Sequence, residues 1–157
     1  MQPRGRRVVV VGAGEVAERR VRALLDAGAR VTLVAPEASA GLARLARQGR
    51  LGWERRRYRE GDLRGAFVAF AASDDRDANR AVAAEARRRG ILVNAADDPG
   101  ACDFTMPAVA RSGPVCVAVS TGGTSPTLAQ HLRDALARRL LWGRRSLRRA
   151  PRAQERL

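Results

Sequence analysis

A glycine turn between a short apolar strand and an amphipathic helix restricts this chain to a small set of folds. The apolar run 8–11 leads directly into Gly12-Ala13-Gly14, and apolar residues then recur at helical spacing as far as Gly28. A second apolar strand follows over residues 30–35, which completes a βαβ unit. In such a unit the glycines let the backbone approach a pyrophosphate, and the helix N-terminus favours its negative charge. The pattern therefore predicts a dinucleotide-binding unit.

Strand and helix patterns continue to alternate in the order that a parallel sheet requires. The sequence predicts a short helix ending at Gly49, strands at 51–58, 66–72 and 91–96, and a helix at about 75–89 after the cap Ser73-Asp74-Asp75. The arginine-rich strand 51–58 is expected near an edge. After Pro107 come a strand at 115–120, a polar turn and a helix at 127–141. These patterns predict an α/β fold, a Rossmann-like doubly wound parallel sheet followed by a small α+β segment.

The charge of the chain is strongly positive and unevenly distributed. All 30 basic residues are arginines, and the formal net charge is +14. Residues 138–157 hold eight of the arginines and one glutamate, so half of the excess lies near the C-terminus. Such a balance suits an acidic small molecule or a nucleic acid, and charge alone does not choose between them. We interpret the C-terminal stretch as a solvated basic tail.

Other features concern location, thiols and metals. No apolar run approaches the roughly 20 residues of a membrane span, and an arginine-containing N-terminus leads straight into the first strand. We therefore expect a cytoplasmic protein with no membrane partner. Cys102 and Cys116 match no zinc or redox spacing, and both thiols are expected to be buried. His131 has no second His or Cys at i+4, so no bound metal is expected.

Polar and small residues gather where the predicted strands end, at 12–16, 36–37, 72–73 and 94–98. The carboxyl ends of parallel strands meet at one edge of a sheet, which is where open α/β sheets bind ligands. Glu37 stands one step beyond the position from which an acid usually holds the ribose hydroxyls. The absence of an arginine at 35–38 argues against the 2′-phosphate of NADP.

Six segments together carry a family resemblance: VVGAGEVAER at 10–19, VTLVAP at 31–36, AASDD at 71–75, VNAADD at 93–98, CDF with MPA at 102–108, and STGGTSP at 120–126. Their order closely resembles the siroheme synthase N-terminal family, the precorrin-2 dehydrogenases, over about residues 6–140. The resemblance implies NAD-dependent oxidation of precorrin-2 to sirohydrochlorin. In some members of the family it also implies insertion of ferrous iron.

The resemblance also assigns roles to individual residues. Asp97 matches the family's essential aspartate, and a carboxylate beside the cofactor can accept or orient a proton. The implied tetrapyrrole contacts form a turn that by itself predicts a helix cap: Thr121, Gly122, Gly123, Thr124 and Ser125. The candidate cofactor-binding residues are Gly12, Gly14, Glu15, Val16, Pro36, Glu37, Ala72, Ser73 and Asn94.

From the patterns and the resemblance together we expect a homodimer with three parts. These are an NAD-binding Rossmann domain at 1–107, a segment for dimerisation and the substrate pocket at 108–141, and the arginine-rich tail at 142–157. Two alternatives to a precorrin-2 dehydrogenase stay open. One is a bifunctional dehydrogenase and ferrochelatase that also takes ferrous iron. The other is a non-catalytic Rossmann-type module whose tail binds nucleic acid, against which the low aromatic content of 4% argues.

Overall fold

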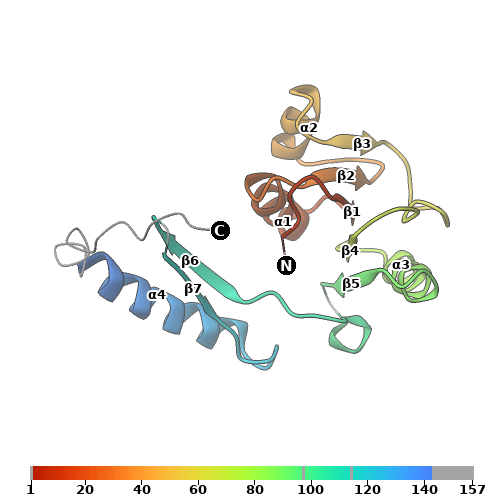
Figure 1. Cartoon of the computed structure of the whole chain (residues 1–157). Helices are drawn as coiled ribbons and strands as arrows, with labels where there is room; N and C mark the ends of the chain where they lie inside the picture. Colours follow the sequence, from red (N-terminus) through yellow and green to blue (C-terminus); the bar gives the residue numbers. More distant parts are fainter. Residues whose placement is uncertain (1, 97, 114, 143–157) are drawn as a thin grey trace, which may run out of the picture. The chain divides into compact units, whose positions relative to one another are not determined.

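The structure of the chain, a computed structural model, describes residues 2–96, 98–113 and 115–142. It divides into two compact units, Met1–Phe104 and Thr105–Leu157. The first unit holds a parallel sheet with its helices, and the second holds a strand pair with one helix (Figure 1).

The sheet of the first unit has five parallel strands in the order β3-β2-β1-β4-β5. The strands are β1 (Arg7–Val11), β2 (Arg30–Val34), β3 (Gly52–Glu54), β4 (Val68–Ala71) and β5 (Leu92–Ala95). In the register, Val11 of β1 pairs with Val34 of β2 and with Ala71 of β4, which in turn pairs with Ala95 of β5. The carboxyl ends of these four strands therefore lie side by side. The predicted Rossmann-like sheet is confirmed.

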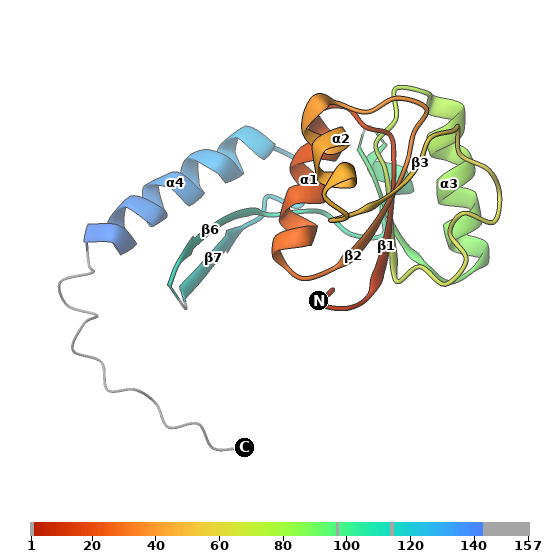
Figure 2. The same cartoon turned by 90° about the horizontal axis from the view of Figure 1, so that it is seen from above.

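Helices cover both faces of this sheet, α1 (Glu15–Asp26) and α2 (Ala40–Arg47) on one face and α3 (Arg76–Arg88) on the other (Figure 2). Alternate residues of a strand point to opposite faces, so Val8 and Val10 pack with α1 and α2, whereas Val9 and Val11 pack with α3. All four valines are buried. Burial on both faces explains why β1 is an unbroken apolar run instead of an alternating one.

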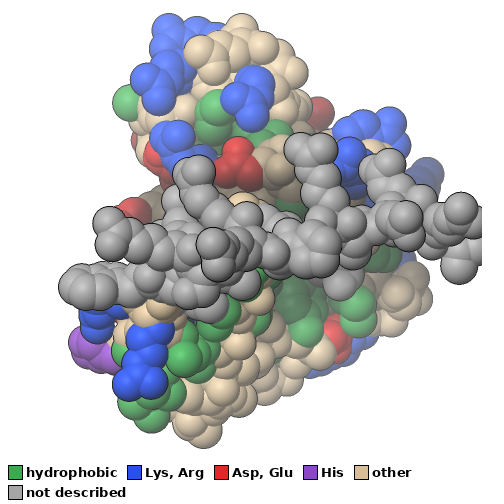
Figure 3. All heavy atoms as spheres, turned by 60° about the vertical axis from the view of Figure 1, so that its left-hand side comes forward, with side chains coloured by type: hydrophobic (Ala, Val, Ile, Leu, Met, Phe, Trp, Pro, Cys, Tyr) green, Lys and Arg blue, Asp and Glu red, His purple; other side chains and the backbone are tan. Residues whose placement is uncertain are grey.

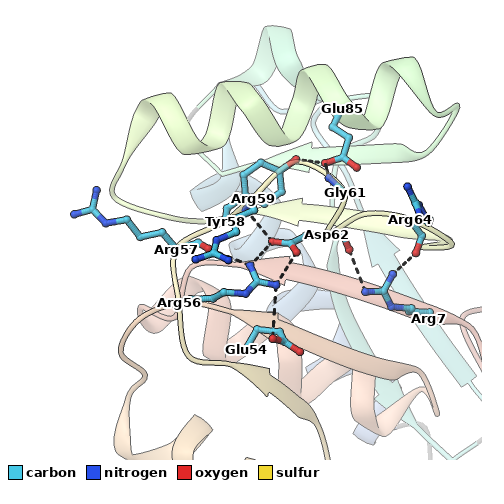
Figure 4. Close-up of polar contacts among 10 residues, drawn as sticks. All are labelled: Arg7, Glu54, Arg56, Arg57, Tyr58, Arg59, Gly61, Asp62, Arg64 and Glu85. Atoms are coloured by element: carbon cyan, nitrogen blue, oxygen red, sulfur yellow. Dashed lines mark hydrogen bonds and ion pairs between the residues drawn. The ribbon is translucent and has the colours of Figure 1, made fainter.

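Polar contacts organise the connection between β3 and β4 (Figure 4). Arg56 donates two hydrogen bonds of 2.8 Å to the carboxylate of Asp62. Further along, the Tyr58 hydroxyl and the Gly61 N–H both donate to the carboxylate of Glu85 on α3, the second at 3.0 Å. Residues 55–67, all of them described, form no α-helix. Arg7 of β1 also donates to the carbonyl oxygen of Asp62 at 3.0 Å. Side-chain bonds thus hold this segment against the sheet and α3.

The predicted strand at 51–58 is correct in its position at the edge of the sheet but too long. β3 ends at Glu54, after only three residues. The contacts of Arg56 and Tyr58 direct the chain away from β2 beyond that point. Residues 55–58 therefore form loop contacts and do not continue the hydrogen-bonded ladder with β2.

The second unit is built on an antiparallel pair, β6 (Ala108–Ser112) and β7 (Val115–Val119), with α4 (Pro126–Trp142) packed against both strands. β6 was not among the predicted strands. The expectation that both thiols are buried is wrong for this chain, because Cys116 is exposed. α4 covers one face of the pair, and side chains of β7 alternate between the two faces. The tail predicted at 142–157 begins on the last residue of α4, and 143–157 lie outside the described residues.

Candidate functional site

Gly12 directly follows β1 and fixes the shape of the glycine turn. Its φ of 99° lies in a region that residues with a side chain rarely adopt. A Cβ atom at this position would also lie 2.1 Å from the carbonyl oxygen of Ala72 and 2.5 Å from the nitrogen of Ser73. Glycine is required here by conformation and by space. This close approach brings three of the predicted cofactor residues together.

Gly14 is the N-cap of α1 and leaves the start of the helix open. No side chain caps the first turn, and a Cβ atom on Gly14 would meet nothing within 4 Å. Helix N-termini carry backbone N–H groups without intrahelical partners and favour anions. Glu15 and Val16 follow directly and are exposed. Free amides beside open space fit the pyrophosphate of a dinucleotide.

The negative charge of Glu18, in the first turns of α1, is compensated by neighbouring side chains. Ser39, the N-cap of α2, donates a hydrogen bond to its carboxylate, and Arg22 forms an ion pair with it. The hydrogen bond from Ser39 and then that from Arg22 lower the pKa of Glu18. A Cβ atom at Gly41 would lie 2.1 Å from the same carboxylate. The hydrogen bond from Ser39 therefore connects α1 to α2, and the negative charge of Glu18 is compensated near a helix end that favours anions.

The end of β2 places Pro36 and Glu37 on the surface, after the buried Ala35. Trp53 of β3 donates from Nε1 to the carbonyl oxygen of Ala35 at 2.9 Å, which holds this strand end in place. The guanidinium of Arg55 lies over the ring of Trp53, 4.3 Å from its centroid. Residues 35–38 hold no arginine, and Arg55, which directly follows β3, was not among the predicted site residues.

Ser73, after β4, is fixed by a buried asparagine of α3. Its N–H donates to Oδ1 of Asn79 at 3.1 Å, and Nδ2 of Asn79 donates to the carbonyl oxygen of Ser73 at 2.8 Å. Asn79 is 8% exposed. The two bonds hold the turn after β4 on the first turn of α3, beside the glycine turn.

Asn94 of β5 has one half of its amide bonded and the other half free. Nδ2 donates to the carbonyl oxygen of Phe104 at 2.8 Å. Oδ1 is buried and has no hydrogen-bond partner within the part of the chain that the structure describes. A buried acceptor without a donor costs about 1–3 kcal/mol. A ligand that donates a hydrogen bond here would remove that cost.

Asp97, the predicted catalytic residue, lies outside the described residues.

A pocket of about 190 Å³ lies between the start of α3 and the 3₁₀ turn Pro99–Ala101 that follows β5. None of its α3 residues was among the predicted site residues, because arginines on a helix surface give no sequence signal that separates a site from a solvated face. The pocket is lined by Arg76, Asn79, Arg80, Ala95, Asp98 and Ala101.

The predicted substrate residues Thr121–Ser125 form a tight turn in the second unit. The Thr121 hydroxyl donates to the carbonyl oxygen of Ser125 at 3.0 Å and accepts from its N–H at 3.1 Å. Ser125 Oγ accepts from the N–H of Leu128, as the predicted helix cap requires. The side chains therefore stabilise the turn itself, and their contact with a substrate stays a prediction.

Neither a metal-binding cluster nor a membrane-spanning helix is found among the described residues. Residues 2–96, 98–113 and 115–142 contain no group of three or more His, Cys, Asp or Glu side chains arranged to hold a metal ion. The same ranges contain no helix that is both long and apolar enough to cross a membrane.

Two family models match the chain. The model described as "Putative NAD(P)-binding" matches residues 1–108, and "Sirohaem biosynthesis protein central" matches residues 113–139. The chain is 49% identical over 128 residues to the siroheme synthase of Methylococcus capsulatus, an alignment that covers 82% of this chain and 27% of that protein. It is 47% identical over 133 residues to the siroheme synthase of Chromobacterium violaceum, covering 85% and 28%.

A solved structure, "SirC, precorrin-2 dehydrogenase", superposes with a TM-score of 0.77 at 29% sequence identity, covering 98% of this chain and 81% of that one. By contrast, the chain spans little more than a quarter of the length of the curated relatives that it matches.

Proposed function

Because the chain belongs to the siroheme synthase N-terminal family, we propose that it oxidises precorrin-2 to sirohydrochlorin with NAD. The likeness to a precorrin-2 dehydrogenase over 98% of the chain carries this proposal, because it extends well beyond the nucleotide-binding part. The open glycine turn supports it, since backbone amides and free space are what a pyrophosphate needs.

The bound cofactor would accept a hydride as one more ring double bond forms in the substrate. The first unit offers the groups that would hold it. Gly14, Glu15 and Val16 would bind the pyrophosphate, and Pro36 and Glu37 the adenosine side. Ala72, Ser73 and Asn94 lie at the ends of β4 and β5, on the other side of the central strand. The unpartnered Oδ1 of Asn94 supports a contact with a hydrogen-bond donor of the cofactor.

The oxidation also releases a proton. We assign Asp97 as its acceptor from the family resemblance.

In the second unit, the turn of residues 121–125 would receive a carboxylate of the substrate. The N–H of Gly123 supports this, because within the described part of the turn no acceptor is bonded to it, whereas the N–H of Gly122 and that of Thr124 are both bonded. We assign residues 1–107 to the cofactor and 108–141 to association and substrate binding.

The second unit would form a homodimer. A two-stranded ladder is marginally stable by itself. Apolar side chains remain exposed on β6 and α4: Val109 at 38%, Leu128 at 50%, Leu132 at 45% and Leu136 at 44%. Hydrophobic side chains are visible beside the histidine on this surface (Figure 3). Exposed apolar groups on so small a unit favour burial against a second copy.

The direct test is to mix the purified chain with precorrin-2 and NAD without oxygen, and to follow NADH and the sirohydrochlorin spectrum together. We expect both to rise, and Asp97→Ala to reduce turnover by about 10²–10⁴-fold while NAD still binds. Asp74→Ala removes an exposed carboxylate after β4 and serves as the matched control with unchanged turnover. Bound NAD without either product would contradict the proposal. Ferrous iron added to the product mixture tests for chelation.

A further inference from the structure

The pocket beside α3 is too small for a whole tetrapyrrole but large enough for one of its side arms. Its volume of about 190 Å³ is below the roughly 300–1,000 Å³ of sites that enclose a complete small-molecule ligand. It opens next to Ala95, at the carboxyl end of β5, where ligands of open α/β sheets bind. Size and position therefore suit a projecting group of a ligand whose main body lies outside.

The lining of this pocket carries an excess of positive charge, with two guanidinium groups and one carboxylate. The carboxylate of Asp98 already accepts two backbone bonds, from Gly100 at 3.0 Å and Ala101 at 3.2 Å. Arg80 pairs with Asp77, but both side chains are exposed, at 71% and 84%. Such a surface pair contributes about 0–1 kcal/mol, so Arg80 can exchange it for a ligand at little cost.

Arg76 stands at the first residue of α3, where a positive charge opposes the helix dipole. Its guanidinium has no hydrogen-bond or ion-pair partner among the residues that the structure describes. The backbone amides of this helix start are not the binding groups, because Asp75 caps those of Asp77 and Ala78 at 2.9 and 3.1 Å. An uncompensated arginine in an unfavourable position is explained if a bound anion supplies its partner.

The framework of the pocket is rigid. Asn79 lines it and is held by two hydrogen bonds to the backbone of Ser73. Arg87 of α3 donates to the carbonyl oxygen of Gly100 at 3.2 Å, which ties the 3₁₀ turn to the helix. A site of this kind keeps its shape before the ligand arrives, so that little ordering entropy is lost on binding.

We infer that this pocket is a carboxylate subsite, in which Arg76 and Arg80 bind one acidic side arm of the tetrapyrrole substrate. The inference rests on the proposed function for the identity of the ligand. Arginine suits the task because its planar guanidinium matches a carboxylate with two parallel hydrogen bonds. Binding of one side arm would orient the macrocycle without taking part in the oxidation.

The test compares the double variant Arg76→Ala/Arg80→Ala with Arg47→Ala/Arg50→Ala in the full chain. The control removes the same charge near the end of α2, on the opposite face of the sheet. Binding of sirohydrochlorin is titrated by its absorption spectrum, and KM and kcat are measured with precorrin-2. In the first variant we expect Kd and KM to rise about 10- to 100-fold, with kcat and NAD affinity unchanged. Arg76→Lys/Arg80→Lys should restore part of the affinity, because it keeps the charge and loses the bidentate geometry.

Each outcome decides the inference. Equal Kd values for the first variant and the wild type would overturn it, as would the same loss in the control or no binding of sirohydrochlorin by the wild type. The proposed function is judged separately. If the wild type binds sirohydrochlorin through these arginines but does not oxidise precorrin-2, the subsite stands and the dehydrogenase assignment falls.

Discussion

At the scale of single residues, the two glycines of the turn after β1 are required for different reasons. Gly12 has a positive φ, and its backbone contacts the strand end at Ala72. Gly14 has ordinary extended φ and ψ angles and open space around its missing Cβ. The first glycine therefore belongs to the stability of the fold, and the second to access for a ligand.

Substitution separates these two roles. Gly12→Ala should lower the free energy of unfolding by about 2–4 kcal/mol, because the methyl group would overlap the carbonyl of Ala72. Gly14→Ser should leave that free energy within about 0.5 kcal/mol yet weaken NAD binding about tenfold, because its hydroxyl can cap the amides that a pyrophosphate uses. Urea unfolding and calorimetric titration with NAD measure both quantities. Equal effects of the two substitutions on stability would contradict this division.

At the residue scale, sequence predicts a structural position best where one residue type has one physical use; the turn is as predicted, and its contact with a cofactor stays a prediction. Glycines in a strand-to-helix turn marked Gly12 and Gly14 in this way. The residues of α3 that line the pocket or hold Ser73 could not be predicted, because their residue types have many possible uses. Arg76 and Asn79 look like ordinary polar positions of an amphipathic helix, and only the fold shows that one lines a pocket and the other holds Ser73.

At the scale of elements, the connection between β3 and β4 depends on the buried carboxylate of Glu85. Its side chain is 1% exposed and accepts hydrogen bonds from Tyr58, Gly61 and Arg89. Burial alone would raise the pKa of Glu85, but these hydrogen bonds outweigh it and lower the pKa below its ordinary value of 4.5. The ionised form thus holds the connection onto α3.

This linkage predicts a pH-dependent stability. A carboxyl group with a lowered pKa in the folded state stabilises fully above its ordinary pKa, and that contribution disappears as pH falls through the lowered value. Glu85→Gln should cost about 2–4 kcal/mol at pH 7, and its difference from the wild type should shrink below about pH 4. Glu60→Gln, which alters an exposed ion pair with Arg88 in the same segment, should stay within about 0.5 kcal/mol. Urea unfolding from pH 7 to 3 provides the measurement, and a constant difference would refute the linkage.

The elements themselves were predictable to the extent that their apolar period was clear. β1, β4 and the helices follow from it, and Asp75 was identified as part of the cap of α3. β6 was missed because Ala108–Ser112 contains one strongly apolar side chain among small and polar ones. A strand of that composition is specified by its partner β7 and by α4, which local sequence does not contain.

At the scale of the whole molecule, the two units differ in how they can be stabilised. The first has a buried core on each face of its sheet. The second has one helix for two strands, and the face of β6 and β7 that α4 leaves uncovered carries Val109, Arg111, Cys116 and Ala118. The first unit needs no partner to bury its core, whereas the second gains most from association.

We expect two copies of the chain to associate through the face of β6 and β7 that α4 leaves uncovered. Val109→Glu places a charge at the centre of the expected interface and should convert a dimer to a monomer, because an unpaired charge is costly to bury. NAD affinity should not change, since the cofactor residues belong to the first unit, while turnover should fall if the substrate pocket needs both copies. Gln130→Glu adds the same charge on α4, away from the row Leu128, Leu132 and Leu136, and should stay dimeric. Light scattering after size exclusion reads the mass directly, and a dimeric Val109→Glu variant would show that the copies associate through another face.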